Sequence, residues 1–197
     1  GLARLSQPAQ FFGTVSTDPL GVRLMRAMRD EGVDAGAVVR VDAPTTLSLV
    51  GLDVDGVPSY VFYGEGGADR MLPESALERL PPAHVFHFGS YSMVVDTVAS
   101  TLHELVAREH LRSVIAYDPN VRLRVEPSLE RWRSVMAWMR PRTHLLKTSL
   151  EDLALVSPGV APATIAAEWL RAGTALVVVT RGAEGAEAWT ADHHVEV

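Results

Sequence analysis

The sequence predicts an α/β fold built on a mostly parallel sheet with helices on its faces. Helix-type and strand-type patterns alternate along most of the chain, which is typical of parallel strands joined by crossover helices. The run from Ala175 to Val179 is apolar and mostly β-branched, as expected for a strand buried on both faces. Turn residues follow several such runs, and open α/β sheets bind ligands at those carboxyl ends.

Composition narrows the class of protein further. The chain has 197 residues, of which 47% are hydrophobic and 21% charged, so it can bury one ordinary globular core. The net charge of −6 is opposite in sign to the excess of basic residues expected of a protein that binds nucleic acid or an anionic membrane. The absence of cysteine excludes disulfides and thiolate metal sites. No apolar run approaches the ~18 residues of a membrane span, and the N-terminus lacks a signal-peptide pattern. We therefore expect a cytoplasmic protein that binds neither nucleic acid nor membrane.

The N-terminal quarter predicts one strand and one helix. Residues 10–16 have a strand pattern. Asp18 is a good helix N-cap, Pro19 suits the first helical position, and Gly32 is placed to end the helix. Leu24, Met25 and Met28 in this helix are expected to pack inward.

The pattern then changes to two strands without a helix between them. Residues 47–53 and 59–63 flank Asp55-Gly56, which is a hairpin turn signal. Residues 38–64 therefore form a β-rich excursion that is expected to leave the main sheet.

The alternation resumes in the remainder of the chain. Strands are expected at residues 84–88, 113–117, 143–147 and 175–179, and helices at residues 93–110, 129–140, 150–155 and 162–172.

Polar residues follow the strand at 113–117. Asp118, Asn120 and Arg122 are expected at its carboxyl end. An Arg fork and an Asn amide can hold sugar hydroxyls or phosphate oxygens there through paired hydrogen bonds. The same residues also fit an Asp-Pro turn whose Arg lies in solvent.

Two further strands end in polar turns. The segment Lys147–Asp152 contains Ser149 followed by acidic residues, which fits a helix N-cap as well as a binding site. Thr180 is followed by Gly182 and Gly185, which allow close approach to a ligand and also fit a simple tight turn. Neither a Walker loop nor a Rossmann fingerprint occurs, and the second absence disfavours a dehydrogenase.

These three segments, in this order and spacing, resemble the PfkB or ribokinase family of sugar kinases. The resemblance extends back through Asp18-Pro19-Leu20-Gly21, Gly32-Val33-Asp34 and Pro44-Thr45-Thr46, and covers essentially the whole chain. It implies a ribokinase-like three-layer α/β/α fold with a mostly parallel sheet and a small β-hairpin lid. Residues 1–197 then form the central part of one kinase domain, with residues 38–64 as the lid excursion.

The resemblance also implies ATP and Mg²⁺ and assigns roles to individual residues. Ser149 and Asp152 stand where the family has an Asn-x-x-Glu motif, and a shorter acid can still act on Mg²⁺ through a water. The implied sugar-binding residues are Asp118, Asn120, Arg122, Tyr60 and Tyr63; the implied nucleotide-binding residues are Lys147, Ser149, Thr180, Gly182 and Gly185; the implied metal residue is Asp152.

The predicted lid indicates the kind of sugar that is bound and a partner chain. Relatives that act on sugar acids often carry an Arg after the aromatic pair, and Gly64 at that position favours a neutral sugar. Family lids often pair with a second subunit, so a homodimer through the lid is expected.

Two family signatures are not found in these residues. The Gly-Ala-Gly-Asp segment that carries the catalytic base is expected beyond Val197, and a Gly-rich sugar-binding segment before Gly1. Ser16 also stands where the first family signature usually has Gly. We predict a fructokinase-like, ATP- and Mg²⁺-dependent kinase of a sugar hydroxyl. A non-catalytic sugar- or nucleotide-binding remnant, a nucleoside kinase and a 2-keto-3-deoxygluconate kinase remain as alternatives.

Overall fold

The computed structural model describes the backbone of residues 1–52 and 58–197 and the side chains of residues 1–51 and 61–197. The predicted turn at Asp55-Gly56 lies outside the described residues. The chain divides into two compact units, Gly1–Pro81 with Asp96–Thr101 and Pro82–Val95 with Leu102–Val197.

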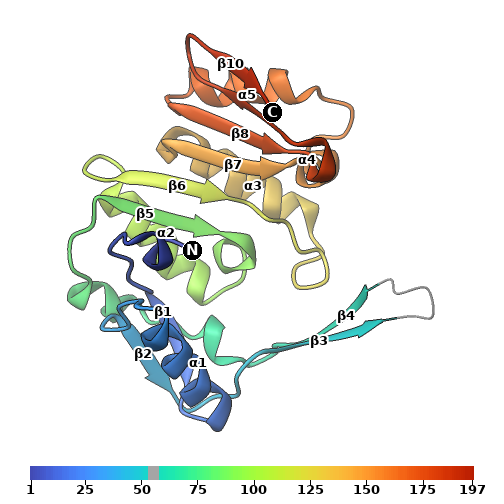
Figure 1. Ribbon diagram of the computed structural model, residues 1–197. Coiled ribbons are helices and arrows are strands. Elements are labelled where there is room, and N and C mark those ends of the chain that lie inside the picture. Colours follow the sequence, from blue (N-terminus) through green and yellow to red (C-terminus); the bar gives the residue numbers. More distant parts are fainter. Residues whose placement is uncertain (53–57) are drawn as a thin grey trace. The chain divides into compact units, whose positions relative to one another are not determined.

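The described residues of the first unit form two small sheets and one complete α-helix (Figure 1). Its elements are β1 (Gly13–Ser16), α1 (Pro19–Asp30), β2 (Val38–Val41), β3 (Leu47–Leu52) and β4 (Pro58–Tyr63), with 3-10 turns at Ala3–Leu5, Ala68–Arg70 and Glu74–Arg79. β1 runs parallel to β2, and β3 pairs antiparallel with β4. The two strands of the predicted hairpin therefore pair with each other, whereas β2 pairs with β1.

Helix α1 begins and ends where its sequence predicts. Asp18 caps it by accepting a hydrogen bond from Gly21 N at 2.7 Å, and Gly32 follows its end with a left-handed φ of 72°. Asp18 also accepts from Thr45 N at 2.9 Å, which ties the start of α1 to the chain just before β3. The expectation that Leu24 packs inward is wrong, because this side chain is 47% exposed.

The β3–β4 pair carries an apolar face. Leu47 lies directly opposite Tyr63, and Leu49 opposite Val61, so the antiparallel register places these four side chains on the same face. They are between 40% and 60% exposed. The hairpin therefore presents a contiguous apolar surface that the described residues leave uncovered.

The second unit is built on a six-stranded sheet with the order β10-β9-β8-β7-β6-β5. Its elements are β5 (Val85–Gly89), α2 (Val98–Glu109, whose first turn belongs to the first unit), β6 (Val114–Asp118), α3 (Leu129–Met139), β7 (Leu145–Ser149), α4 (Leu150–Val156), α5 (Pro162–Arg171), β8 (Leu176–Thr180), β9 (Ala186–Trp189) and β10 (His194–Glu196), with 3-10 turns at Ser90–Met93, Arg140–Arg142 and Gly182–Glu184. Strands β5 to β8 are parallel, and β9 and β10 are added antiparallel. All four predicted strands of this unit are present.

One face of this sheet forms the core. Ile115, Tyr117, Leu146, Val177 and Val179 alternate along the three central strands and are at most 1% exposed. Helices pack on this face: the ring of Trp169 in α5 stacks on Tyr117 with centroids 6.3 Å apart, and Trp132 in α3 is fully buried.

The second unit differs from the sequence-based expectation in two places. The helix predicted from residue 93 begins at Val98, and a 3-10 turn at Ser90–Met93 comes first. The chain after Gly185 forms β9 and β10, which the sequence did not predict. These strands contain four and three residues, and such short strands provide too little alternation for a pattern to be recognised.

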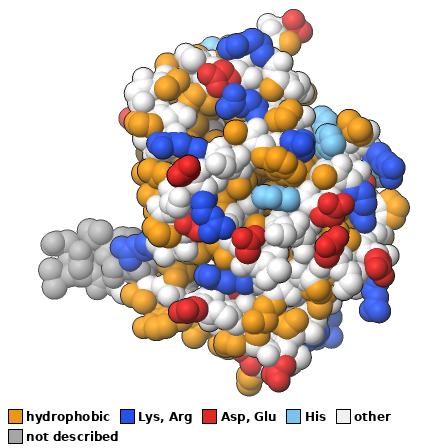
Figure 2. Space-filling model, turned by 180° about the vertical axis from the view of Figure 1, so that it is seen from behind, with side chains coloured by type: hydrophobic (Ala, Val, Ile, Leu, Met, Phe, Trp, Pro, Cys, Tyr) orange, Lys and Arg blue, Asp and Glu red, His pale blue; other side chains and the backbone are white. Residues whose placement is uncertain are grey.

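The described part of the chain contains no helix that is both long and apolar enough to cross a membrane. On the face shown in Figure 2, Lys and Arg side chains are interspersed with acidic and apolar side chains.

Candidate functional site

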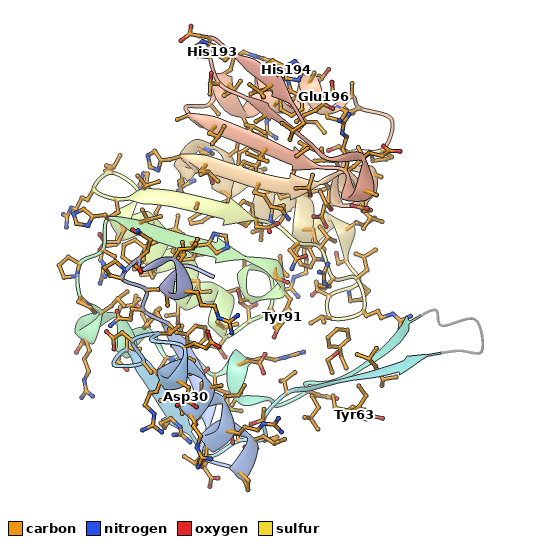
Figure 3. All side chains as sticks on the ribbon, viewed as in Figure 1. Asp30, Tyr63, Tyr91, His193, His194 and Glu196 are labelled. Atoms are coloured by element: carbon orange, nitrogen blue, oxygen red, sulfur yellow. The ribbon has the colours of Figure 1, made fainter. Side chains whose placement is uncertain are left out.

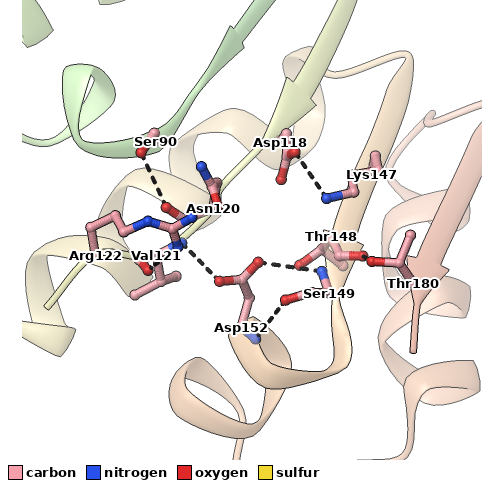
Figure 4. A network of polar contacts seen from close by, with 10 residues as sticks. All are labelled: Ser90, Asp118, Asn120, Val121, Arg122, Lys147, Thr148, Ser149, Asp152 and Thr180. Atoms are coloured by element: carbon pink, nitrogen blue, oxygen red, sulfur yellow. Dashed lines mark hydrogen bonds and ion pairs between the residues drawn. The ribbon is translucent and has the colours of Figure 1, made fainter. Parts of the chain in front are cut away.

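Polar side chains from the four parallel strands gather at the carboxyl edge of the six-stranded sheet (Figure 4). Ser90 directly follows β5, Asp118 ends β6, Ser149 ends β7 and Thr180 ends β8, while Lys147 lies two residues before the end of β7. Parallel strands bring their carboxyl ends to one edge, so residues some thirty positions apart become neighbours.

Asp118 and Lys147 form an ion pair across β6 and β7. Lys147 Nζ lies 3.1 Å from Asp118 Oδ2, and the two side chains are 39% and 21% exposed. The other carboxylate oxygen, Asp118 Oδ1, is buried and accepts no hydrogen bond within the described residues. Lysine occurs once among the 18 Lys and Arg residues of the chain, at this position. The edge therefore offers one unsatisfied acceptor beside one ammonium group.

The loop after β6 presents an amide and a guanidinium. Asn120 has a left-handed φ of 41°, and its side-chain amide bonds to no group that the structure describes. Arg122 Nη1 donates to Val121 O at 2.8 Å, and the rest of this exposed guanidinium is unpaired within residues 1–51 and 61–197. Both side chains are therefore available to a ligand.

Ser149 and Asp152 form a capping box at the start of α4. Ser149 Oγ accepts from Asp152 N at 3.1 Å, while Asp152 Oδ2 accepts from Ser149 N at 3.3 Å. Asp152 Oδ1 accepts from Val121 N at 2.8 Å, and the residue is only 5% exposed. The carboxylate thus links the start of α4 to the loop after β6.

Tyr117 places a hydroxyl beneath this edge. The residue is fully buried, and its hydroxyl has no hydrogen-bond partner in the described part of the chain. Burial raises the pKa of Tyr117 above its ordinary value, and the negative charges of Asp118 and Asp152 raise it further. The phenol therefore stays protonated at neutral pH.

The turn after β8 combines an exposed and a packed glycine. Gly182 has a left-handed φ of 59° with open space around its Cβ position, and within the described chain the N–H groups of Gly182 and Ala183 have no acceptor. Gly185, at φ 89°, lies so close to Val197 O that a Cβ would overlap that oxygen. Gly182 therefore faces open space, whereas Gly185 accommodates neighbouring backbone.

The side chain of Arg181, which lies between Thr180 and Gly182 in the sequence, is held by ion pairs. Its guanidinium lies 3.1 Å from Glu187 Oε1 and 2.6 Å from Glu196 Oε1. The hydrogen bond with Glu196 raises the pKa of Arg181 and lowers the pKa of Glu196. Strands β9 and β10 thus anchor the turn after β8.

Of the two predicted aromatic contacts, only Tyr63 has a described side chain. Tyr63 extends from β4 and is 60% exposed (Figure 3). Tyr60 pairs with Val50 in the β3–β4 register, and its side chain lies outside the described residues. Both belong to the first unit, whereas the other predicted site residues belong to the second.

Gly89 and Ser90 also lie at this edge and were not among the site residues predicted from the sequence. A Cβ at Gly89 would overlap Asp118 O, so glycine lets β5 pass close to β6 at this edge. Ser90 Oγ donates to Asn120 O at 3.2 Å. A sequence signal for them existed, because a Gly-Ser pair follows the strand predicted at residues 84–88. In the structure Gly89 lies beside Asp118, which ends the next strand.

Among the described residues, no group of three or more His, Cys, Asp and Glu side chains is arranged to hold a metal ion. Any metal at this edge would need ligands besides these side chains, such as phosphate oxygens and water.

Comparisons with known proteins find similar sequences and similar folds. A family model described as pfkB family carbohydrate kinase matches residues 1–197. A fructokinase from Rhizobium leguminosarum bv. trifolii is 34% identical over 200 residues, which cover all of this chain and 60% of that protein. The chain therefore spans less than two thirds of the length of this curated relative.

Solved structures share the fold. A fructokinase from Xylella fastidiosa with bound ATP matches with a TM-score of 0.86 at 24% identity, over all of this chain and 64% of that one. A fructokinase from Vibrio cholerae O395 in a form with fructose, ADP and calcium ion matches with a TM-score of 0.84 at 25% identity, with the same coverage. These likenesses confirm the predicted fold class.

Proposed function

Because the chain belongs to the pfkB family of carbohydrate kinases, we propose that the whole protein transfers the terminal phosphoryl group of ATP to a hydroxyl of fructose or a closely similar neutral sugar. The observation that carries this proposal is the convergence of polar groups, some of them unpaired within the described residues, at the carboxyl edge of β5 to β8. Phosphoryl transfer depends on positioning and on charge stabilisation more than on covalent chemistry, and such an edge supplies both.

The loop after β6 is suited to the sugar. Asp118 Oδ1 is a buried, unsatisfied acceptor for a hydroxyl, and the Asn120 amide and Arg122 guanidinium offer donors that the described residues leave unpaired. A neutral sugar needs this mixture of acceptors and donors. The 34% identical fructokinase supports fructose as the sugar, as does Gly64, which leaves no cation directly after Tyr63.

The turns after β7 and β8 are suited to the nucleotide. Lys147 contributes an ammonium, and Ser149 and Thr180 contribute hydroxyls. The N–H groups beside Gly182 have no acceptor in the described chain and are suited to phosphate oxygens. Gly185 gives the turn the room that it needs beside Val197.

Mg²⁺ at this edge would neutralise phosphate charge. Both Asp152 oxygens already accept backbone N–H groups, so we propose that Asp152 contributes through a bridging water. Asp118, with its unpaired oxygen, lies at the same edge. This donor chemistry fits a magnesium ion that keeps several waters.

An ADP-release assay on the full-length protein with Mg²⁺ tests the function. Fructose, ribose, 2-keto-3-deoxygluconate and adenosine are the acceptors to compare. Turnover highest on fructose is expected. Highest turnover on adenosine or on the keto acid would replace the proposed substrate, and binding of fructose and ATP without turnover would favour a non-catalytic binding protein.

Arg122 offers a sharper test of the sugar assignment. We expect Arg122→Ala to raise the KM for fructose about tenfold, since a charged donor to a hydroxyl is lost, with little change in the KM for ATP. Arg112→Ala is the matched control, because Arg112 is also exposed but precedes β6 at the opposite end of the sheet. Equal effects of Arg122→Ala on both substrates would contradict the assignment.

We also propose that a second copy of the chain covers the apolar face of the β3–β4 hairpin. Leu49 and Val61 lie opposite each other there and are 54% and 50% exposed. Leu49→Glu is expected to shift the full-length protein from dimer to monomer in light scattering after size exclusion. Ser48→Glu places the same charge on the opposite face of the same strand, and an equal shift there would contradict the proposal.

A further inference from the structure

Two residues at the carboxyl edge that are not glycine have left-handed backbone conformations. Ser90, after β5, and Asn120, after β6, have φ angles of 59° and 41°. Left-handed conformations are uncommon for residues other than glycine and persist where the surroundings hold them. Directly before Ser90, the backbone of Gly89 passes so close to Asp118 O that no Cβ would fit.

The contact between the two strained residues is specific. Ser90 Oγ donates to Asn120 O at 3.2 Å. Asn120 O and Val121 N belong to one peptide group, and Val121 N donates in turn to Asp152 Oδ1 at 2.8 Å. This peptide plane is therefore held at its carbonyl by a side chain that follows β5 and at its N–H by a side chain from α4 (Figure 4).

Holding one peptide plane fixes how the chain continues beyond Asn120. A change in ψ of Asn120 or φ of Val121 turns the following chain, and so moves the Arg122 backbone relative to the Asn120 side chain. Both hydrogen bonds join residues about thirty positions apart in the sequence. The orientation is thus imposed by tertiary contacts and not by the loop itself.

We propose that Ser90 is a positioning residue for the sugar, which with Asp152 fixes the Asn120–Val121 peptide group so that Asn120 and Arg122 face the substrate. This role rests on the proposed function of the same edge. Ser90 acts through the peptide group and need not touch the sugar.

Ser90→Ala in the full-length protein removes the hydroxyl and keeps the left-handed backbone. The KM for fructose is expected to rise about three- to tenfold, as for the loss of one hydrogen bond. The KM for ATP is expected to stay within about twofold, because the turns after β7 and β8 do not contact this hydroxyl. Ser90→Gly also relaxes the backbone, so it should raise the fructose KM equally without lowering the melting temperature as far as Ser90→Ala does.

Ser113→Ala is the matched control. Ser113 Oγ donates to Ala83 O at 2.7 Å, so it joins the chain segments just before β5 and β6 as Ser90 joins those just after them. This variant removes the same kind of bond at the far end of the sheet and is expected to leave both KM values unchanged. An equal rise in fructose KM for Ser113→Ala, or none for Ser90→Ala and Ser90→Gly, would overturn the proposal.

Amide exchange at Val121 separates this proposal from the proposed function. Ser90→Ala is expected to speed exchange of the Val121 N–H relative to wild type, whereas Ser113→Ala is not. Unchanged Val121 exchange would overturn the role of Ser90 even if the protein phosphorylates fructose. Absence of both fructose binding and turnover in the wild type would overturn the proposed function, and the sugar-positioning role with it.

Discussion

The Asp152 carboxylate accepts hydrogen bonds from two backbone N–H groups, so the loss of folding stability on its removal can be calculated. Asp152→Ala leaves Val121 N, in a residue 5% exposed, without an acceptor, and also removes the bond to Ser149 N. A buried unpaired donor costs about 1–3 kcal/mol, and a lost cap about 1 kcal/mol. The half-buried Ser149 N–H can find water, so the total is about 2–4 kcal/mol.

Equilibrium unfolding of the full-length protein in urea measures this loss. Glu151→Ala is the matched control, because Glu151 lies in the same first turn of α4 but is exposed and should contribute about 0.5 kcal/mol or less. A loss for Asp152→Ala no larger than for Glu151→Ala would refute the reasoning that this carboxylate joins α4 to the loop after β6.

Asp152 also tests the proposed metal role. Asp152→Asn keeps the size of the side chain, removes its charge and replaces one of its two accepting oxygens by an amide NH2 group. The Mg²⁺ concentration needed for half-maximal activity is expected to rise, since a neutral amide holds a metal-bound water less strongly than a carboxylate does. An unchanged magnesium requirement would limit Asp152 to its structural role.

Three further predictions concern other parts of the chain. Hydrogen bonds from the backbone N–H groups of Gly21 and Thr45 hold the pKa of Asp18 well below its ordinary 3.8, so its contribution to stability is complete above about pH 5 and is lost as pH falls towards the lowered pKa. A fall in the protection of the Gly21 amide on acidification, measured against its intrinsic exchange rate at each pH, checks this. Gly185→Ala is expected to cost about 1–3 kcal/mol in thermal unfolding, because its Cβ overlaps Val197 O. Trp132→Ala is expected to cost about 3–5 kcal/mol in urea unfolding, because the ring is fully buried.

Each of these has its own control. Asp18→Asn should remove the acid dependence of Gly21 amide protection, and persistence of that dependence would point to another group. Gly182→Ala has a similar left-handed φ but open space, so a loss equal to that of Gly185→Ala would exclude the Val197 contact as the cause. A smaller loss for Trp132→Phe than for Trp132→Ala is expected, and equality would show that the ring volume contributes little.

Much of the fold followed from local patterns. Buried strands such as β6 and β8 have dense apolar runs, and α1 has an N-cap at Asp18 and a glycine after its end, so these elements were predicted close to their observed bounds. The family resemblance stated on three polar segments is confirmed by the family match over residues 1–197. Strands β9 and β10 were missed because they are short and lie at the antiparallel edge, where few side chains are buried.

The residues at the carboxyl edge were predictable, but most of their contacts were not. Polar residues after β6, β7 and β8 were identified because the chain leaves a buried strand there. The sequence suggested that Ser149 caps a helix, and the structure confirms it with Asp152 in a capping box. It did not indicate that Asp152 also reaches Val121, or that Ser90 takes part at all.

The sequence by itself determined the α/β class, the ends of most elements and the polar residue types at the carboxyl edge, because these depend on patterns within a few neighbouring residues. Only the tertiary structure decided that Asp118 pairs with Lys147 and that Ser90 and Asp152 hold one peptide group between them. These contacts depend on strand register and on the close passage of β5 by β6 at Gly89. Such pairings arise between residues about thirty positions apart, where local propensity carries no information about which partners meet.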